Sequence, residues 1–268
     1  MRHPRELTAA VLIPVVLAIL VFAPLWAWAL LVALAAGLAL AEFYRLLRAA
    51  GWAVPEVAGY AVFLAIAVAA YFRSLAGLAG AAAAGLVLLP TLVMFSSPPV
   101  GVLLASSASS VFATLYIALG AGSVIVLRSV GWRPVLFLLA VVWASDSAAY
   151  YVGRRFGRRK LAPVVSPKKT IEGLWGQLGG GVAVGLLASV FLYPNGSPFL
   201  LAALGLAIAG LAVVGDLLES TFKRSCDVKD SGGLLPGHGG LLDRLDSLLY
   251  VAPPALAVAL FLPEVLPR

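Results

Sequence analysis

The sequence predicts an all-α, polytopic integral membrane protein with about nine transmembrane helices and with cytoplasmic polar loops after helices 6 and 8. Of the 268 residues, 62% are hydrophobic and only 12% are charged, and the mean hydropathy is +1.02. Soluble domains carry about 25% charged residues, so we exclude a soluble globule, a disordered chain and a coiled coil. The single cysteine, Cys226, excludes an internal disulfide and a cysteine-rich metal site.

Apolar stretches long enough for a spanning helix, about 20 residues, recur along the chain. The uncharged stretch 7–41 has room for two helices, and Pro24 predicts a turn between them. The other seven spans are expected at 57–72, 75–95, 100–127, 134–152, 174–193, 199–218 and 247–262. The first apolar run continues into a second helix, unlike the short core of a signal peptide, so we interpret it as a membrane anchor.

The distribution of Lys and Arg predicts the orientation of these helices in the membrane. With nine spans, 15 of the 19 basic residues fall on one side and 4 on the other. Cytoplasmic loops carry the excess of basic residues. We therefore expect the N-terminus and both long polar loops in the cytoplasm.

Most charged residues fall in two segments, and the first of them is 146–172. It begins with Asp146 inside an apolar helix. Charge is costly in hydrocarbon, so an acid there is a functional candidate by default. The alternative is a structural ion pair with Arg154, two turns further on. The basic run 154–160 is expected to bind anionic lipid headgroups.

The same segment contains Ser-Pro-Lys-Lys-Thr, which has a more specific pattern. Thr170 can cap the helix that follows, and Glu172 would lie in the first turn of that helix. Lys168 and Lys169 then stand beside a helix N-terminus, where ammonium groups and free N–H donors suit a phosphate. We favour anion binding here over simple anchoring.

The second segment, 216–246, is the densest polar stretch of the chain. If the eighth helix continues to about residue 224, four polar residues spaced i, i+3, i+4 and i+7 share one face; they are Asp216, Glu219, Ser220 and Lys223. Asp243 and Asp246 are also spaced i, i+3, at the start of the ninth helix. Two helices thus bring pairs of carboxylates to the membrane edge, and the alternative is a salt-bridged loop.

Carboxylates with few histidines suit hard cations such as Mg²⁺, which accepts one or two carboxylates together with substrate phosphates. Glycines in the segment let backbone N–H groups approach a ligand, and His238 is a candidate for contact with a phosphate or a base. These residues predict phosphate transfer with a divalent metal, which needs charge neutralisation and alignment more than a covalent nucleophile. The apolar helices around them indicate a lipid substrate.

These residues also resemble a known family. From Ser220 to Asp246 the chain reads S-x-F-K-R-x4-K-D-x-G-x2-L-P-x-H-G-G-L-x-D-R-L-D, which resembles the signature of the phosphatidate cytidylyltransferases, or CDP-diacylglycerol synthases, at all 27 positions. Asp146-x-x-Ala-Tyr and Ser-Pro-Lys-Lys-Thr-x-Glu-Gly resemble that family too. The resemblance covers about residues 140–250, whereas the first 130 match only in hydropathy and small-residue content.

The resemblance implies that phosphatidate and CTP give CDP-diacylglycerol and pyrophosphate by direct attack of the lipid phosphate on the α-phosphorus of CTP. It implies a need for Mg²⁺, with a monovalent ion such as K⁺ beside it. The implied catalytic residues are Asp243, Lys223 and Asp216, and the implied metal ligands are Asp216, Asp243, Asp246 and Glu219. The implied substrate-binding residues are Lys168, Lys169, Ser220, Arg224, Lys229, His238, Gly239, Arg244 and Asp146.

The predicted organisation follows from this assignment. Residues 1–133 would form N-terminal membrane helices, about five spans, and residues 134–268 a C-terminal catalytic membrane region of about four spans. We expect a plasma (inner) membrane enzyme of phospholipid biosynthesis with its active site facing the cytoplasm. The expected partners are CTP, phosphatidate and the bilayer, without nucleic acid, and the resemblance implies a homodimer.

Other readings share part of this pattern. A CTP-dependent polyprenol or phytol kinase, or a CDP-archaeol synthase, would use the same metal and nucleotide chemistry on another lipid. The CDP-alcohol phosphatidyltransferases resemble Asp-Gly-x2-Ala-Arg, a string that this sequence lacks. An ion-coupled transporter would place ionisable residues near the midplane of several helices, yet only Asp146 and Asp216 approach the membrane.

Overall fold

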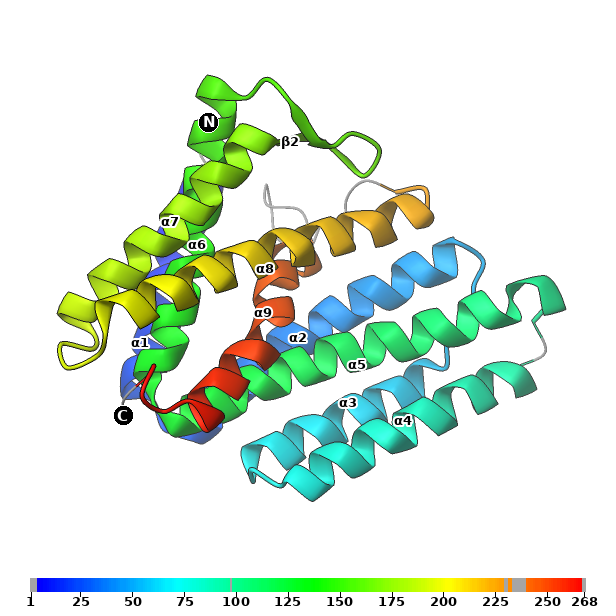
Figure 1. The fold of residues 1–268 in the computed structure, drawn as a ribbon. Coiled ribbons are helices and arrows are strands. Elements are labelled where there is room, and N and C mark those ends of the chain that lie inside the picture. The colour runs from blue at the N-terminus through cyan, green and yellow to red at the C-terminus, as the bar shows by residue number, and fades with distance from the viewer. Residues whose placement is uncertain (1–3, 97, 229–230, 233–239, 267–268) are drawn as a thin grey trace. The chain divides into compact units, whose positions relative to one another are not determined.

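The structure is a computed structural model, and it describes residues 4–96, 98–228, 231–232 and 240–266. Within these residues the chain forms nine helices and one two-stranded sheet (Figure 1). The helices are α1 Pro4–Phe22, α2 Leu25–Ala49, α3 Glu56–Tyr71, α4 Leu75–Phe95, α5 Val100–Val130, α6 Trp132–Phe156, α7 Ile171–Phe191, α8 Pro198–Ser225 and α9 Leu242–Phe261. The strands are β1 Lys160–Ala162 and β2 Ser166–Thr170.

The predicted all-α membrane fold is confirmed. In the described part of the chain, seven helices are long and apolar enough to span a bilayer. The Leu12–Phe22 part of α1 and helix α3 are apolar but shorter. The predicted turn at Pro24 is also confirmed, because this residue is the N-cap of α2. The protein is therefore an integral membrane protein.

Three helices extend well beyond the apolar stretches from which the spans were predicted, and the first is α2, which continues to Ala49 although its stretch ends at 41. Helix α8 continues through the polar residues to Ser225, as the shared-face interpretation required, and α9 begins at Leu242 rather than at 247. Hydropathy marks only the part of a helix that suits lipid, so a polar extension of the same helix is missed.

The polar loop after α6 contains a hairpin that was not predicted from the sequence. Strands β1 and β2 pair antiparallel, with Lys160 opposite Thr170 and Ala162 opposite Ser166. Thr170 then caps α7, as predicted, because its hydroxyl accepts a hydrogen bond from the Gly173 N–H at 3.1 Å. This cap fixes where β2, with its two lysines, meets the start of α7.

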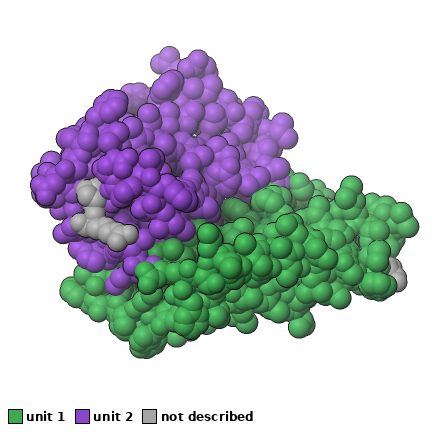
Figure 2. Space-filling view, turned by 60° about the horizontal axis from the view of Figure 1, so that its bottom comes forward, with its two compact units in different colours: residues 1–126, 222–245 green, residues 127–221, 246–268 purple. Residues whose placement is uncertain are grey.

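The chain forms two compact units, which Figure 2 colours separately. Unit 1 contains residues 1–126 and 222–245, and unit 2 contains residues 127–221 and 246–268. Helices α8 and α9 each contribute residues to both units. The division predicted at residue 133, between membrane helices and a catalytic region, stays a prediction.

In unit 1, α3 packs against α2 and α4. The hydroxyl groups of Tyr44 and Thr114 lie 2.6 Å apart and join α2 to α5. Ser106 and Ser110 on α5 bond the backbone N–H and C=O of Ala53, at 3.0 and 3.3 Å. The serines of α5 thus satisfy a polar backbone turn that would otherwise be costly to bury.

In unit 2, glycines allow α7 to approach its neighbours closely. A Cβ on Gly176 would meet Val152 of α6 at 2.7 Å. Gly181 of α7 and Gly205 of α8 face one another so closely that a Cβ on either would overlap the carbonyl oxygen of the other. Small residues that let helix backbones approach are a typical device of membrane helix packing, and here they bring the polar ends of α6, α7 and α8 together.

Candidate active site

The predicted phosphate-binding lysine and a predicted metal ligand meet in unit 2. The Lys169 ammonium nitrogen lies 2.7 Å from Asp216 Oδ2. Lys169 is placed by β2 directly before α7, and Asp216 is placed by the polar end of α8. The two charge-rich segments, 146–172 and 216–246, are therefore in direct contact through this ion pair.

Asp146 lies in the second half of α6, between Trp132 and Phe156, and its partner comes from the neighbouring helix. Gln177 of α7 donates a hydrogen bond from Nε2 to Asp146 Oδ1 at 3.0 Å, and the Gln177 side chain is buried. The alternative ion pair with Arg154 is not among those that join described residues; the Arg154 guanidinium instead donates to the Tyr150 hydroxyl at 3.1 Å. Gln177 was missed, although an amide inside a glycine-rich apolar helix is the kind of polar exception that could have identified it.

Asp246 is buried in unit 2, with 8% of its surface exposed. It interacts electrostatically with Asp216 and Asp146, and its Oδ1 accepts a hydrogen bond from the Ser247 N–H at 2.6 Å. Helices α8 and α9 are close here, since a Cβ on Gly215 would lie 2.7 Å from the Tyr250 Cβ. Three carboxylates from three helices thus share one electrostatic environment with Lys169.

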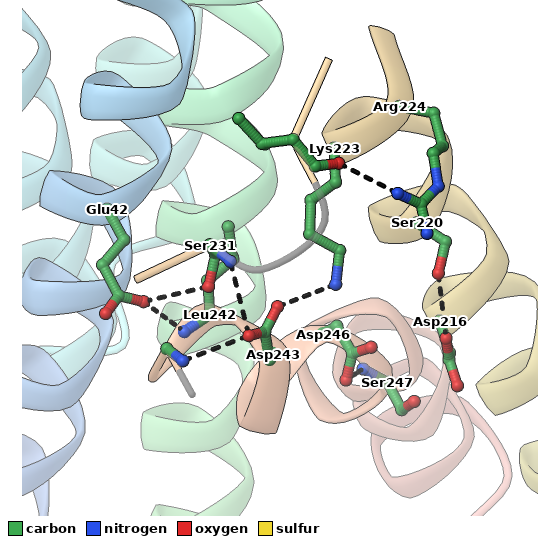
Figure 3. Close-up of polar contacts among 12 residues, drawn as sticks. Glu42, Asp216, Ser220, Lys223, Arg224, Ser231, Leu242, Asp243, Asp246 and Ser247 are labelled. Atoms are coloured by element: carbon green, nitrogen blue, oxygen red, sulfur yellow. Dashed lines mark hydrogen bonds and ion pairs between the residues drawn. The ribbon is translucent and has the colours of Figure 1, made fainter. Parts of the chain in front are cut away.

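Lys223 and Asp243 form the second cluster, in unit 1 (Figure 3). The Lys223 ammonium donates to Asp243 Oδ1 at 2.8 Å, and the two side chains are only 13% and 15% exposed. Asp243 Oδ2 accepts hydrogen bonds from the N–H groups of Gly240 at 3.1 Å and Ser231 at 3.4 Å. Asp243 therefore joins Lys223 to Ser231 and Gly240, the described ends of residues 231–240, which we call the glycine-rich segment.

Glu42 of α2 also contacts this segment, and it was not among the residues predicted from the sequence. Its carboxylate is fully buried and accepts from the Leu242 N–H at 2.8 Å and from the Ser231 hydroxyl at 3.4 Å (Figure 3). An acid inside an apolar helix was the argument for Asp146, and the same argument applied to Glu42 could have found it.

The remaining predicted residues lie in several environments. Ser220 donates from its hydroxyl to Asp216 Oδ1 at 3.4 Å, which confirms that these two share a face of α8. Glu219 is buried. Lys168, Arg224 and Arg244 are exposed. Lys229, His238 and Gly239 lie outside the described residues.

The donor set in unit 2 fits a hard divalent cation better than any other metal, because it consists of carboxylate oxygens. Within the described parts of the chain, no group of three His, Cys, Asp or Glu side chains is arranged as a metal site. Mg²⁺ takes only one or two carboxylates and completes its shell with waters and substrate phosphates. The carboxylates of unit 2 therefore fit a Mg²⁺ ion whose remaining ligands are waters and the phosphates of a substrate.

Comparison with known proteins agrees with the sequence signature. The chain is 45% identical to a phosphatidate cytidylyltransferase of Staphylococcus epidermidis over 126 residues, which is 47% of this chain and 48% of that protein. It is 44% identical to one of Staphylococcus saprophyticus over 138 residues (52% and 53%) and to one of Staphylococcus aureus over 126 residues (47% and 48%). The chain thus spans about half the length of these relatives.

A model of a whole protein family matches a longer part of the chain than the individual relatives do. The model of the Cytidylyltransferase family matches residues 3–262, which include both polar segments and all nine helices in the described part of the chain. The chain therefore belongs to the cytidylyltransferase family.

Proposed function

We propose that the protein is a phosphatidate cytidylyltransferase, which transfers CMP from CTP to phosphatidate and releases pyrophosphate. The observation that carries this proposal is the ion pair between Lys169 and Asp216, which unites a phosphate-binding sequence with a carboxylate cluster at the end of membrane-spanning helices. Family membership and the activity for which the staphylococcal relatives are named support the same substrates.

The carboxylates of unit 2 are the proposed holders of Mg²⁺. Asp216 and Asp246 would supply oxygen ligands, with Asp146 beside them and Glu219 in support. When bound, the ion would neutralise and align the phosphates of CTP. The second, monovalent ion is proposed on the family resemblance alone.

In the proposed reaction a phosphate oxygen of phosphatidate attacks the α-phosphorus of CTP. A phosphorus–oxygen bond forms, the bond from the α-phosphorus to the oxygen that bridges it to the β-phosphate breaks, and pyrophosphate leaves with the electron pair. Lys169 offers positive charge to the phosphates, and the exposed Lys168 adds to it. The lipid phosphate is itself the nucleophile, so the protein has to bind and orient rather than form a covalent intermediate.

Lys223 and Asp243 have a different proposed role in unit 1. Three donors already bind the Asp243 carboxylate, which supports a role in holding Lys223 and the glycine-rich segment in place. Direct metal binding by Asp243 stays a prediction from the family resemblance. The exposed Arg224 and Arg244 are proposed to contact phosphate groups of CTP or the lipid.

Transfer of a labelled α-phosphate tests this function. Purified protein in lipid vesicles receives CTP labelled at the α-phosphate, Mg²⁺, and phosphatidate, diacylglycerol or a polyprenol as acceptor. We expect label in a CDP-lipid only with phosphatidate, and a loss of about 100-fold or more in the Asp216→Asn variant. Arg133→Ala, an exposed basic residue of the same unit that lies outside the basic run 154–160, serves as the control with unchanged activity. Wild-type protein that labels no lipid in the presence of phosphatidate contradicts the proposal.

A further inference from the structure

Glu42 caps helix α9 from helix α2, far outside residues 140–250, which carry the sequence signature. Leu242 is the first residue of α9, and its N–H is one of the donors that a helix start leaves without a partner inside the helix. Glu42 Oε2 accepts from this N–H at 2.8 Å across 200 residues of sequence. The positive end of the helix dipole favours a carboxylate at this position.

The burial of Glu42 is not explained by packing alone. A fully buried carboxylate is costly unless charge and hydrogen bonds compensate for the lost water. Arg45 Nη2 lies 3.8 Å from Glu42 Oε1, one helical turn away, and the Ser231 hydroxyl donates to Oε2 at 3.4 Å. The partners of Glu42 thus come from its own helix, the glycine-rich segment and the start of α9.

Two glycines make room for this carboxylate. A Cβ on Gly232 would lie 2.7 Å from Glu42 Oε1, and a Cβ on Gly240 would lie 2.6 Å from Oε2 and overlap the Ser231 hydroxyl. Side chains at these positions would force the carboxylate away from Leu242. Because Gly232 and Gly240 have no side chain, their backbone can lie directly against the Glu42 carboxylate.

Glu42 and Asp243 hold the same part of unit 1. Asp243 Oδ2 accepts from the N–H groups of Ser231 and Gly240, while Glu42 binds the Ser231 hydroxyl and the N–H of Leu242. We propose that Glu42 is a positioning residue, which fixes the start of α9 and Ser231 and thereby sets the orientation of Asp243 and of its partner Lys223. This inference rests on the proposed cytidylyltransferase activity.

Three variants of the full-length protein test the role of Glu42. Glu42→Ala removes the cap, Glu42→Gln keeps one oxygen that can accept from Leu242, and Glu56→Gln is the control. Glu56 lies on α3 of the same unit and forms an ion pair with Arg48. We expect Glu42→Ala to lower kcat about 100-fold with the KM for CTP changed less than about threefold, because misplacement of a group affects turnover more than binding. Glu42→Gln should recover about tenfold of that loss.

A second readout separates positioning from general stability. Hydrogen exchange of the amides at 240–245 should become faster in Glu42→Ala, while the amides of α4 keep the wild-type rate. If Glu42→Ala is not recovered folded, Glu42→Gln decides: lower kcat at an unchanged melting temperature supports the proposal. The proposal is overturned if both Glu42 variants are as active as Glu56→Gln. It is also overturned if a folded Glu42 variant has a lower melting temperature but the wild-type kcat. If the wild-type protein forms no CDP-lipid, the proposed function fails. Independently of that result, hydrogen exchange of the amides at 240–245 that is no faster in Glu42→Ala than in the wild type would show that Glu42 does not hold the start of α9.

Discussion

The ammonium group of Lys169 lies 2.7 Å from Asp216 Oδ2 and joins strand β2 to helix α8 within unit 2. The two side chains are 22% and 37% exposed, and ion pairs that water still reaches contribute only about 0.2–1 kcal/mol to stability. An incoming phosphate can therefore replace Asp216 as the partner of Lys169 at small cost. This exchange would also leave the Asp216 carboxylate available to a cation.

Removal of the Lys169 charge should therefore reduce activity far more than stability. We expect Lys169→Ala to lower kcat/KM for CTP about 100-fold. The melting temperature should shift by less than about 3 °C, because the ion pair with Asp216 contributes little to the free energy of unfolding. Steady-state kinetics and a thermal melt of each purified variant check both values. An equal loss of activity in Arg133→Ala would show that the effect is one of general surface charge.

Replacement of Asp243 should stop turnover and weaken unit 1. The pair with Lys223 is largely shielded from water, and loss of one partner of a buried ion pair leaves the other charge uncompensated. We expect Asp243→Asn to reduce formation of CDP-lipid about 100- to 1,000-fold while the protein still inserts in the membrane. The exposed Asp227→Asn in the same unit is the matched control, and near-normal activity of Asp243→Asn would remove Asp243 from the site.

Much of the fold could be predicted because the membrane imposes a simple rule on composition. Apolar stretches of suitable length gave nine helices at nearly correct positions, and Pro24 gave the first turn. The β1–β2 hairpin was missed, because its strands have three and five residues and contain basic residues that give no alternating pattern. Hydropathy placed the start of α9 at 247 because its first turn is polar, although the i, i+3 spacing of Asp243 and Asp246 had already assigned both to the start of this helix.

The site could be predicted only where the sequence pattern is local. Asp216 and Ser220 lie one turn apart on a single helix, and their contact follows from helix geometry. The contacts of Asp146 with Gln177 and of Glu42 with Leu242 span 31 and 200 residues, and they depend on which helix faces pack together. Hydropathy does not determine which faces those are, because lipid and protein interiors are equally apolar.

Cys226 should react slowly with alkylating reagents. It follows the last residue of α8, it is 6% exposed, and burial, assisted by Asp227, raises the pKa of its thiol. The thiolate is the reactive form, so a raised pKa leaves less of it at pH 7.5. The iodoacetamide rate in the folded protein should lie well below that in denaturant and should rise with pH. Equal rates would contradict the burial of Cys226.

The two ends of α7 should lie on opposite sides of the membrane. Val164 at the hairpin and Asn195 in the turn after α7 are both exposed, and the excess of basic residues predicts a cytoplasmic hairpin. In a Cys226→Ser background, a membrane-impermeant maleimide added to intact cells should label Asn195→Cys at once. Val164→Cys should be labelled only after permeabilisation, and the reverse pattern would invert the proposed orientation.

Phosphorus NMR of the complete reaction tests the central claim most directly. Wild-type protein in vesicles is mixed with phosphatidate, CTP and Mg²⁺, and all phosphorus-containing products are followed together. The proposed reaction predicts one pyrophosphate for each CDP-diacylglycerol, with loss of the phosphatidate signal in equal amount. Release of CDP together with a newly phosphorylated lipid, or consumption of CTP without a CDP-lipid, would contradict it.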